Sequence, residues 1–256
     1  MLRWFEHQQV YHPSRSLEAD GSALGRRWED VYFATSDGFK LNGWFFPGNA
    51  GSSRSEWAML ICHGNAGNIS HRLQLYSTLL ETGVAVFAFD YRGYGRSQGR
   101  PSESGTYLDA QAAHAWLHAR GYAANRIIAL GESLGGGIAS ELCLRETIGG
   151  LILISTFTSI GDLGAELYPW LPIRWINQIG YDTVSKLPKL TVPVLVMHGR
   201  HDELIRFHHA ETNFAAANDP KMFCEIGGRH GDPLADRTAF LRGIEDFLRN
   251  LKSPAR

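Results

Sequence analysis

Cysteine is scarce in this chain, with three residues in 256: Cys62, Cys143 and Cys224. All three fall in segments expected to be core, and an odd number offers no disulfide framework. Long hydrophobic runs are also missing, because no stretch approaches the ~18 apolar residues that span a bilayer and no basic-then-apolar leader opens the chain. We therefore expect a reducing compartment and predict a cytoplasmic protein without a transmembrane segment.

No excess of one charge is present either. Lysine and arginine number 25 against 26 aspartates and glutamates, a formal net charge of −1, and without a basic block nothing favours a nucleic-acid partner. With 44% hydrophobic and 20% charged residues, and no repeat or linker, the chain can bury a large core. We predict a single domain over residues 1–256. No feature of the sequence indicates an oligomeric state.

What the chain does contain is an alternation of apolar strands with helix-like segments. This alternation predicts an α/β fold with a mostly parallel eight-stranded sheet and helices on both faces. Sites on such sheets lie at the carboxyl ends of the strands. The expected strands are 31–35, 40–46, 58–62, 84–89, 126–130, 150–154, 192–197 and 221–226, and the expected helices are 70–82, 104–120, 134–146, 206–217 and 233–251.

Two short stretches match the pattern G-x-S-x-G, one around Ser97 and one around Ser133. Composition alone yields such a match in roughly one chain in five, so only a strand-turn-helix context makes it informative. Ser133 follows the apolar run 127–130 and precedes helix-like spacing, which places it on a strand-to-helix corner. Ser97 lies in a glycine-rich loop before Pro101, and proline disfavours a helical residue before it. We interpret Ser97 as structural and Ser133 as the candidate nucleophile.

A serine nucleophile needs two donors for the oxyanion that forms when it attacks a carbonyl. The helix after the corner would supply the backbone N–H of Leu134 at its positive end. The second donor is expected from the His-Gly loop 63–68, with Asn65 as first choice and Ala66 as the alternative. His63 precedes the serine and adjoins the donor, so we expect it to hold the loop in shape.

The base and its orienting acid are expected downstream of Ser133, each just past the end of a strand. Asp202 follows one predicted strand and His230 follows the next. We predict that Asp202 fixes the tautomer of His230, which takes the serine proton. Glu203 and Asp232 are the alternatives for the acid.

Among the eleven histidines, His114 and His118 lie four apart on an expected helix and could imitate two zinc ligands. No adjacent glutamate and no third ligand accompany them, so we predict no metal site. His208 and His209 fall at the start of the helix after Asp202, where roles on the surface and at the site rim both stay open.

The loops HGNAGN (63–68) and DYRGYGRS (90–97), followed by GESLGG (131–136), resemble the α/β-hydrolase superfamily over nearly the whole chain. They look like the branch that contains eukaryotic membrane-associated serine hydrolases, protein depalmitoylases and their soluble bacterial relatives. The resemblance implies that the loop 90–97 is structural, tied by Asp90, Arg92 and Tyr94. Eukaryotic members carry an amino-terminal membrane helix or a cysteine cluster, and neither is seen here, which argues against membrane-bound depalmitoylation.

Residues 155–190 lie where this superfamily places a short cap over the nucleophile. Their aromatic side chains could line an apolar acyl pocket or could only anchor the cap to the core, and both interpretations stay open. Trp170 and Trp175 are the candidate substrate contacts.

These features predict a carboxylesterase-like serine hydrolase that cleaves small to medium acyl esters through an acyl-enzyme, with no metal or organic cofactor. An acyl thioesterase or depalmitoylase-like enzyme is the alternative, because the same chemistry cleaves both bonds. A non-catalytic binding protein on the same fold is less favoured, since every part of the site is present. A peptidase is also less favoured, because oligopeptidases that resemble this domain carry a large additional domain.

Overall fold

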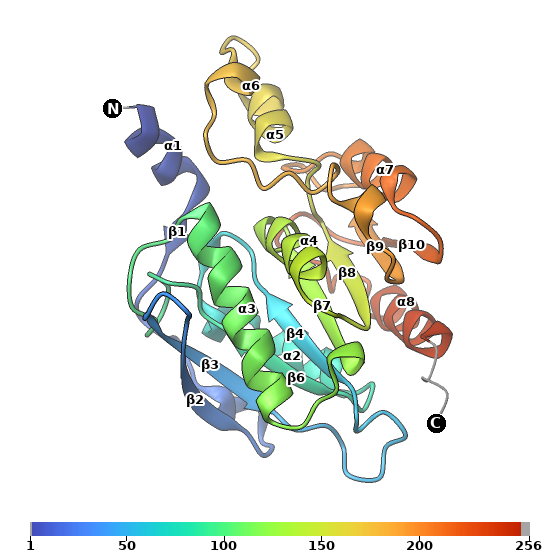
Figure 1. The fold of residues 1–256 in the computed structure, drawn as a ribbon. Helices are drawn as coiled ribbons and strands as arrows, with labels where there is room; N and C mark the ends of the chain where they lie inside the picture. The colour runs from blue at the N-terminus through green and yellow to red at the C-terminus, as the bar shows by residue number, and fades with distance from the viewer. Residues whose placement is uncertain (1, 252–256) are drawn as a thin grey trace.

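Eight strands form the central sheet of the computed structural model, which describes residues 2–251 (Figure 1). Their order is β10-β9-β8-β7-β4-β6-β3-β2. All neighbours from β10 to β6 are parallel, and β3 runs antiparallel to both β6 and β2. The predicted mostly parallel eight-stranded sheet is confirmed. The strands are β2 (Glu29–Ala34), β3 (Lys40–Phe46), β4 (Ala58–Cys62), β6 (Ala85–Phe89), β7 (Ile127–Glu132), β8 (Gly150–Ile154), β9 (Val194–Gly199) and β10 (Lys221–Ile226).

Helices cover both faces of this sheet (Figure 1). On one face lie α3 (Glu103–Ala119), α4 (Leu134–Arg145) and α7 (Phe207–Ala216), and on the other lie α2 (Leu73–Leu80) and α8 (Arg237–Asn250). Successive side chains of a strand point to opposite faces, so Leu60 of β4 belongs to the first core and Ile61 to the second. The apolar runs are therefore continuous because both faces are buried.

The cap, residues 155–190, connects β8 to β9 beyond the carboxyl ends of the strands (Figure 1). It contains two short helices, α5 (Ile160–Leu167) and α6 (Ile173–Ile176). Its stem is tied to α3, because the carboxylate of Glu103 accepts hydrogen bonds from the backbone amides of Gly180 and Tyr181, both at 2.7 Å. The Tyr181 side chain is fully buried.

The amino-terminal region contains two elements that the sequence did not predict, the helix α1 (Leu2–Val10) and a two-stranded parallel ladder of β1 (His12–Pro13) with β5 (Ala66–Gly67). The Glu6 carboxylate accepts hydrogen bonds from the backbone amides of Gln178 (2.8 Å) and Ile179 (2.9 Å). The amino-terminal region therefore joins the cap to the loop that follows β4.

Short 3₁₀ turns complete the described elements, at Gly21–Leu24, Ile69–Arg72, Ala124–Arg126 and Leu187–Lys189. The helix expected over 70–82 thus divides into a 3₁₀ turn and α2. Between residues 2 and 251, no helix has both the length and the apolar character that crossing a membrane requires.

Candidate active site

Ser133 occupies a strained turn between β7 and α4, with φ 52° and ψ −116°. Such a backbone conformation costs of order 1–3 kcal/mol and persists only where the surroundings impose it. The Ser133 amide donates to the carbonyl of Ile154 on β8 at 2.9 Å. A Cβ on Gly135 would collide with the backbone carbonyl of Cys62, and a Cβ on Gly131 would collide with that of Gly135. The glycines therefore let β7, β4 and α4 approach closely enough to hold the serine in this turn.

Three side chains from three loops meet at this turn. The Ser133 hydroxyl lies 3.1 Å from His230 Nε2, and His230 Nδ1 lies 2.9 Å from Asp202 Oδ2. With the proton on Nδ1, the imidazole donates to the carboxylate and Nε2 is free to accept from the serine. The loops after β7, β9 and β10 thus bring together the three residues that the sequence singled out, at the carboxyl ends of their strands.

The Asp202 carboxylate is held from several directions. Its Oδ1 atom accepts hydrogen bonds from the backbone amides of Leu204 (3.0 Å) and Ile205 (2.8 Å). Burial alone would raise the pKa of Asp202, but the hydrogen bond and charge of His230, together with the Ile205 amide, hold its pKa below the ordinary value. The carboxylate is therefore ionised at neutral pH and faces the imidazole.

His198, at the end of β9, also contacts this carboxylate, and the sequence analysis missed it. Its Nε2 atom lies 3.5 Å from Asp202 Oδ2 and donates to the backbone carbonyl of Ile205 at 2.8 Å. Burial lowers the pKa of His198, so its ring is neutral and braces the loop that carries Asp202. A histidine four residues before the acid, at the end of the same strand, was the available signal.

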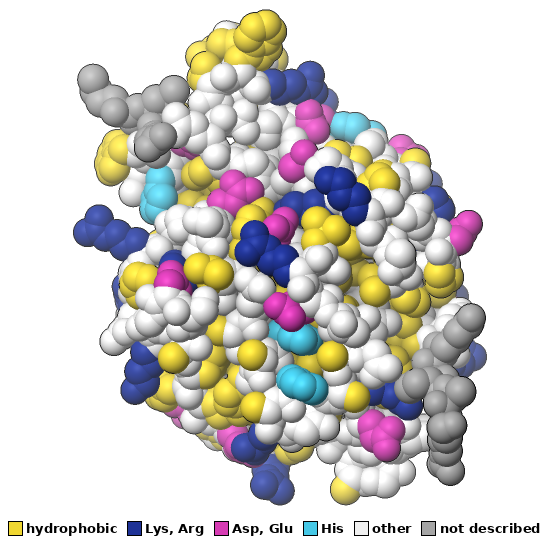
Figure 2. Space-filling model, viewed as in Figure 1, with side chains coloured by type: hydrophobic (Ala, Val, Ile, Leu, Met, Phe, Trp, Pro, Cys, Tyr) yellow, Lys and Arg dark blue, Asp and Glu magenta, His cyan; other side chains and the backbone are white. Residues whose placement is uncertain are grey.

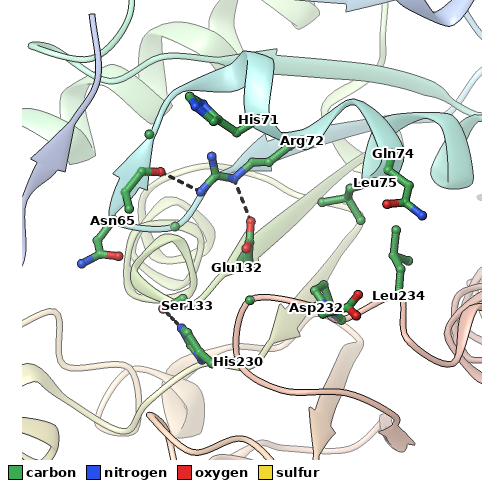
Figure 3. A pocket seen from close by; sticks show the side chains of 15 residues that line it. Asn65, His71, Arg72, Gln74, Leu75, Glu132, Ser133, His230, Asp232 and Leu234 are labelled. Carbon is green, nitrogen blue, oxygen red and sulfur yellow. Dashed lines mark hydrogen bonds and ion pairs between the residues drawn. The ribbon is translucent and has the colours of Figure 1, made fainter. Parts of the chain in front are cut away.

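The two alternative acids occupy different positions. Glu203 accepts a hydrogen bond from the backbone amide of His230 at 3.4 Å rather than from its ring. Asp232 lines the open cavity beside His230 (Figure 3). The atom within hydrogen-bonding distance of His230 Nδ1 is thus Oδ2 of Asp202.

The loop after β4 is fixed beside the serine by contacts to its carbonyls. The carbonyl of Asn65 accepts from the His12 amide (3.0 Å) and from the Tyr94 hydroxyl (2.8 Å). The Arg72 guanidinium donates to the carbonyl of Ala66 at 3.0 Å and to the Glu132 carboxylate at 2.9 Å (Figure 3). These bonds fix the loop at two neighbouring carbonyls.

His63 lies beneath this loop and is fully buried. Its Nδ1 atom donates to the carbonyl of Gly64 at 2.7 Å, and its own carbonyl accepts from the Tyr91 hydroxyl at 2.9 Å. Burial lowers the pKa of His63 well below its ordinary value. The ring is therefore neutral and enclosed, as expected of a residue that shapes the loop.

Ser97 is also fully buried, which removes it from the reacting surface. Its hydroxyl donates to the carbonyl of Asp90 at 2.6 Å and accepts from the amide of Asn42 at 2.9 Å. Arg92 ties the same loop to Asp37 and Asp109 with contacts of 2.8 Å. Arg92 is thus paired with two carboxylates that lie outside the loop. These contacts hold the loop in place, in agreement with the structural role expected for it.

Two cavities meet at Ser133. The larger, of about 500 Å³, lies on the side of α2 and contains the charged side chains, so we call it the polar cavity (Figure 3). The smaller, mainly apolar cavity of about 160 Å³ lies under the cap. Asn65 lines both, Leu134 lines only the apolar one and Ala66 only the polar one. Side chains that set the polar character are His71, Arg72, Gln74, Glu132 and Asp232, and those that line the apolar cavity include Val10, Phe157, Ile160, Leu163, Leu167 and Leu204.

The predicted contacts of Trp170 and Trp175 with substrate need correction, because neither side chain lines either cavity. Trp170 is 74% exposed and Trp175 is 91% exposed, and Figure 2 shows hydrophobic side chains gathered over α6 at the edge of the molecule. Both tryptophans follow the end of α5 at Leu167. The aromatic residues of the cap that do line the apolar cavity are Phe157 and Tyr168.

Comparison with known proteins places this fold and site in a family. The family model described as serine aminopeptidase, S33, matches residues 53–180. The α/β-hydrolase domain-containing protein WAV2 of Arabidopsis thaliana is 32% identical over 261 residues, which cover 91% of this chain and 83% of the relative. The chain belongs to the α/β-hydrolase family. A further relative, an uncharacterized protein of Mycobacterium tuberculosis, is 38% identical over 97% of this chain and 89% of its own length.

Solved structures share the α/β-hydrolase fold over nearly the whole chain. An esterase of Pyrococcus furiosus superposes with a TM-score of 0.77 at 20% identity and covers 95% of this chain and 99% of its own. An α/β hydrolase of Vibrio vulnificus superposes with a TM-score of 0.79 at 19% identity and covers 96% and 93%. The match in fold includes the cap segment, because it extends over almost all of both chains.

Proposed function

We propose that this α/β hydrolase is a serine hydrolase that cleaves small to medium acyl esters, with Ser133 as nucleophile, His230 as base and Asp202 as orienting acid. The observation that carries the proposal is the hydrogen-bonded series from Ser133 Oγ to His230 Nε2 (3.1 Å) and from His230 Nδ1 to Asp202 Oδ2 (2.9 Å). This series begins at a strained turn, where a serine hydroxyl projects toward substrate.

In the proposed reaction, His230 Nε2 takes the proton of Ser133 Oγ as that oxygen attacks the acyl carbonyl. The imidazolium is stabilised by Asp202, whose carboxylate stays ionised. The backbone N–H groups of Asn65 and Leu134 are proposed to bind the oxyanion of the tetrahedral intermediate. His230 then gives its proton to the leaving alcohol, and water cleaves the acyl-enzyme by the same steps in reverse.

The two cavities suggest how an ester lies across Ser133. The apolar cavity under the cap offers the surface that an acyl chain would bury. Leu134 lines this cavity, so an acyl chain there would bring its carbonyl close to the proposed donors. The polar cavity then receives the alcohol. Its position next to His230 suits a group that must be protonated as it leaves.

Two other bonds are candidates for the same machinery. An acyl thioester would occupy the same positions, since only the leaving atom changes. The family description as a serine aminopeptidase favours an aminoacyl amide as a second possibility, and the carboxylates of Glu132 and Asp232 line the polar cavity where an amine could bind. Glu132 is already paired with Arg72, which leaves Asp232 as the free acid in that role.

The decisive experiment is labelling with a fluorophosphonate, which reacts with activated serines. The native chain should label, Ser97→Ala should label equally, and Ser133→Ala should not. Hydrolysis of oxygen esters, thioesters and aminoacyl anilides of graded size is then measured with unlabelled protein. If the native chain stays unlabelled, the serine mechanism is wrong and a binding protein becomes the better interpretation. If Ser133→Ala labels as well as the native chain, the nucleophile is another serine and the proposed triad is wrong.

A further inference from the structure

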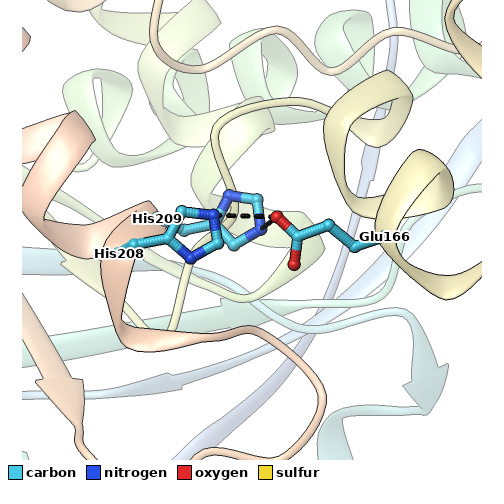
Figure 4. A group of neighbouring side chains, drawn as sticks. All are labelled: Glu166, His208 and His209. Carbon is cyan, nitrogen blue, oxygen red and sulfur yellow. Dashed lines mark ion pairs between the residues drawn. The ribbon is translucent and has the colours of Figure 1, made fainter. Parts of the chain in front are cut away.

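A second cluster of chemically reactive side chains lies outside the proposed active site, where the cap meets the core (Figure 4). Glu166 comes from α5 of the cap, and His208 and His209 come from the start of α7. The Oε1 atom of Glu166 lies 2.8 Å from Nε2 of His208 and 3.3 Å from Nε2 of His209. One nitrogen from each imidazole and one carboxylate oxygen all fall within 4.8 Å of one another.

The His209 ring has a feature that its ion-pair geometry leaves unexplained. Its Nε2 atom is buried and finds no hydrogen-bond partner among the residues that the structure describes. A buried imidazole nitrogen without a hydrogen bond is costly, and a bound metal ion would satisfy it.

The other ring nitrogen of His209 has the surroundings that a metal-bound histidine needs. Nδ1 lies 3.0 Å from the hydroxyl of Thr158, and that hydroxyl donates to the carboxylate of Asp162 at 2.8 Å. Metal-ligating histidines commonly use their second nitrogen to contact a group of this kind, which fixes the ring orientation. The contacts from His209 to Thr158 and from Thr158 to Asp162 therefore fix the orientation of the ring that carries Nε2.

We propose that Glu166, His208 and His209 bind a divalent transition-metal ion of the zinc class and that this ion links the cap to α7. Two imidazoles and a carboxylate suit zinc rather than magnesium or calcium, which prefer oxygen ligands. Zinc bonds of about 2.0–2.1 Å at tetrahedral angles place ligand atoms about 3.3 Å apart. The contact of Glu166 with His209, 3.3 Å, matches that separation, and its contact with His208, 2.8 Å, is shorter. Water would complete the coordination.

Two groups oppose the ion and set how tightly it binds. Nε of Arg206 lies 3.8 Å from Oε2 of Glu166 and repels a cation, although the Arg206 side chain is 70% exposed and is screened by solvent. The backbone amide of Thr158 donates to Nδ1 of His209 at 3.2 Å. Metal at Nε2 requires the proton to reside on Nδ1, so this amide would lose its acceptor while the Thr158 hydroxyl accepts the new N–H.

The consequence of binding concerns the apolar cavity. Helix α5 carries Glu166 and also Leu163 and Leu167, which line that cavity. An ion that joins Glu166 to α7 would hold this wall of the cavity in place. The cap would then be fixed by metal as well as by the contacts of its stem, and hydrogen exchange over residues 160–167 should slow when the ion is added.

The test is isothermal titration calorimetry of the untagged, chelator-treated chain with ZnCl₂, together with thermal unfolding with and without the ion. The native chain should bind one ion at micromolar affinity or tighter, and its Tm should rise. His208→Ala and Glu166→Gln should each weaken binding at least tenfold, while Arg206→Ala should tighten it. His118→Ala, which removes an exposed histidine elsewhere, is the matched control and should bind as the native chain does.

Cobalt(II) provides an independent readout, because ligation by two imidazoles in a low-coordinate site gives visible absorption bands that His208→Ala should abolish. His208 is half exposed, so its replacement leaves the fold intact and the variant remains informative even if Glu166→Gln is unstable. Absence of binding at millimolar ZnCl₂ would overturn the proposal. Equal affinity of the native chain and His208→Ala would do the same.

Discussion

The two cavities at Ser133 are built in different ways. The polar cavity is formed by the loop after β4, the start of α2 and the loop after β10, and two of its charged groups, Arg72 and Glu132, are paired with each other. The apolar cavity is formed by the cap, α1 and Leu204, which come from distant parts of the chain. The polar side is therefore rigid and shared with the proposed catalytic groups. The apolar side depends on elements that can be altered without touching them.

The largest effect on activity is expected from a change that affects substrates in both cavities at once. Asp202→Asn keeps the size of the side chain but loses the acceptor that fixes the His230 tautomer. We expect kcat to fall by about 10⁴-fold for all ester substrates, measured as initial rates with short and long acyl groups. An equal drop for both chain lengths would support a shared role, whereas a drop for one length alone would contradict it.

The next largest effect is expected on the polar side and concerns stability. Arg72→Leu leaves the partly buried Glu132 carboxylate without its partner and removes the donor to the Ala66 carbonyl. Losing one member of a partly buried pair should destabilise by up to about 3 kcal/mol, to be measured by urea unfolding. Replacing Glu132 by leucine in the same chain should recover part of the loss, since the unpaired charge is then gone. No recovery would mean that the contacts to the loop dominate.

A smaller effect, confined to the apolar side, should follow from filling the cavity. Leu163→Trp adds bulk where an acyl chain is proposed to lie, and kcat/KM for long acyl esters should fall roughly tenfold or more while acetyl esters change little. Trp175→Ala is the matched control. Because Trp175 is 91% exposed, its removal should leave both classes of substrate within about twofold of the native enzyme.

A pH dependence of stability is expected beneath the polar side. Burial raises the pKa of Asp90 to about 7, above its value of about 3.9 in an unfolded chain. The folded state then binds more protons between these values, so this group makes unfolding easier as pH rises from about 4 to about 7. Asp90→Asn should remove that slope, seen as a gain in stability relative to the native chain that grows over the same interval and is constant above it. A stability difference that is independent of pH would show that Asp90 does not titrate between about pH 4 and about pH 7.

The sequence predicted those parts of the molecule whose signals are local. The corner at Ser133 could be predicted because an apolar strand, closely spaced glycines and a helix pattern adjoin one another. The positions of Asp202 and His230 followed from the order of strands, and the structure places both within hydrogen-bonding reach of their partners, although their catalytic roles stay predictions. The eight-stranded sheet was predictable because continuous apolar runs mark strands buried on both faces.

What escaped prediction depends on contacts between distant segments or on the direction of a side chain. The pairing of His12 with Ala66 involves two-residue strands, which are too short to show a period. The aromatic content of the cap does not indicate which side chains point toward the serine. The exposed Trp170 was therefore preferred to Tyr168, which lines the cavity. Glu166 and His209 were not linked for the same reason, since only the folded chain brings α5 onto α7.

The hydrogen bonds from the cap to Glu6 also determine when the apolar cavity can first exist during synthesis. Glu6 leaves the ribosome well before Gln178, which lies 172 residues later. At about 5–20 residues per second, the helix α1 waits about 10–30 s for the segment it joins. His230 emerges later still. The residues that line the apolar cavity, of which Leu204 is the last, are therefore all synthesised before the proposed base.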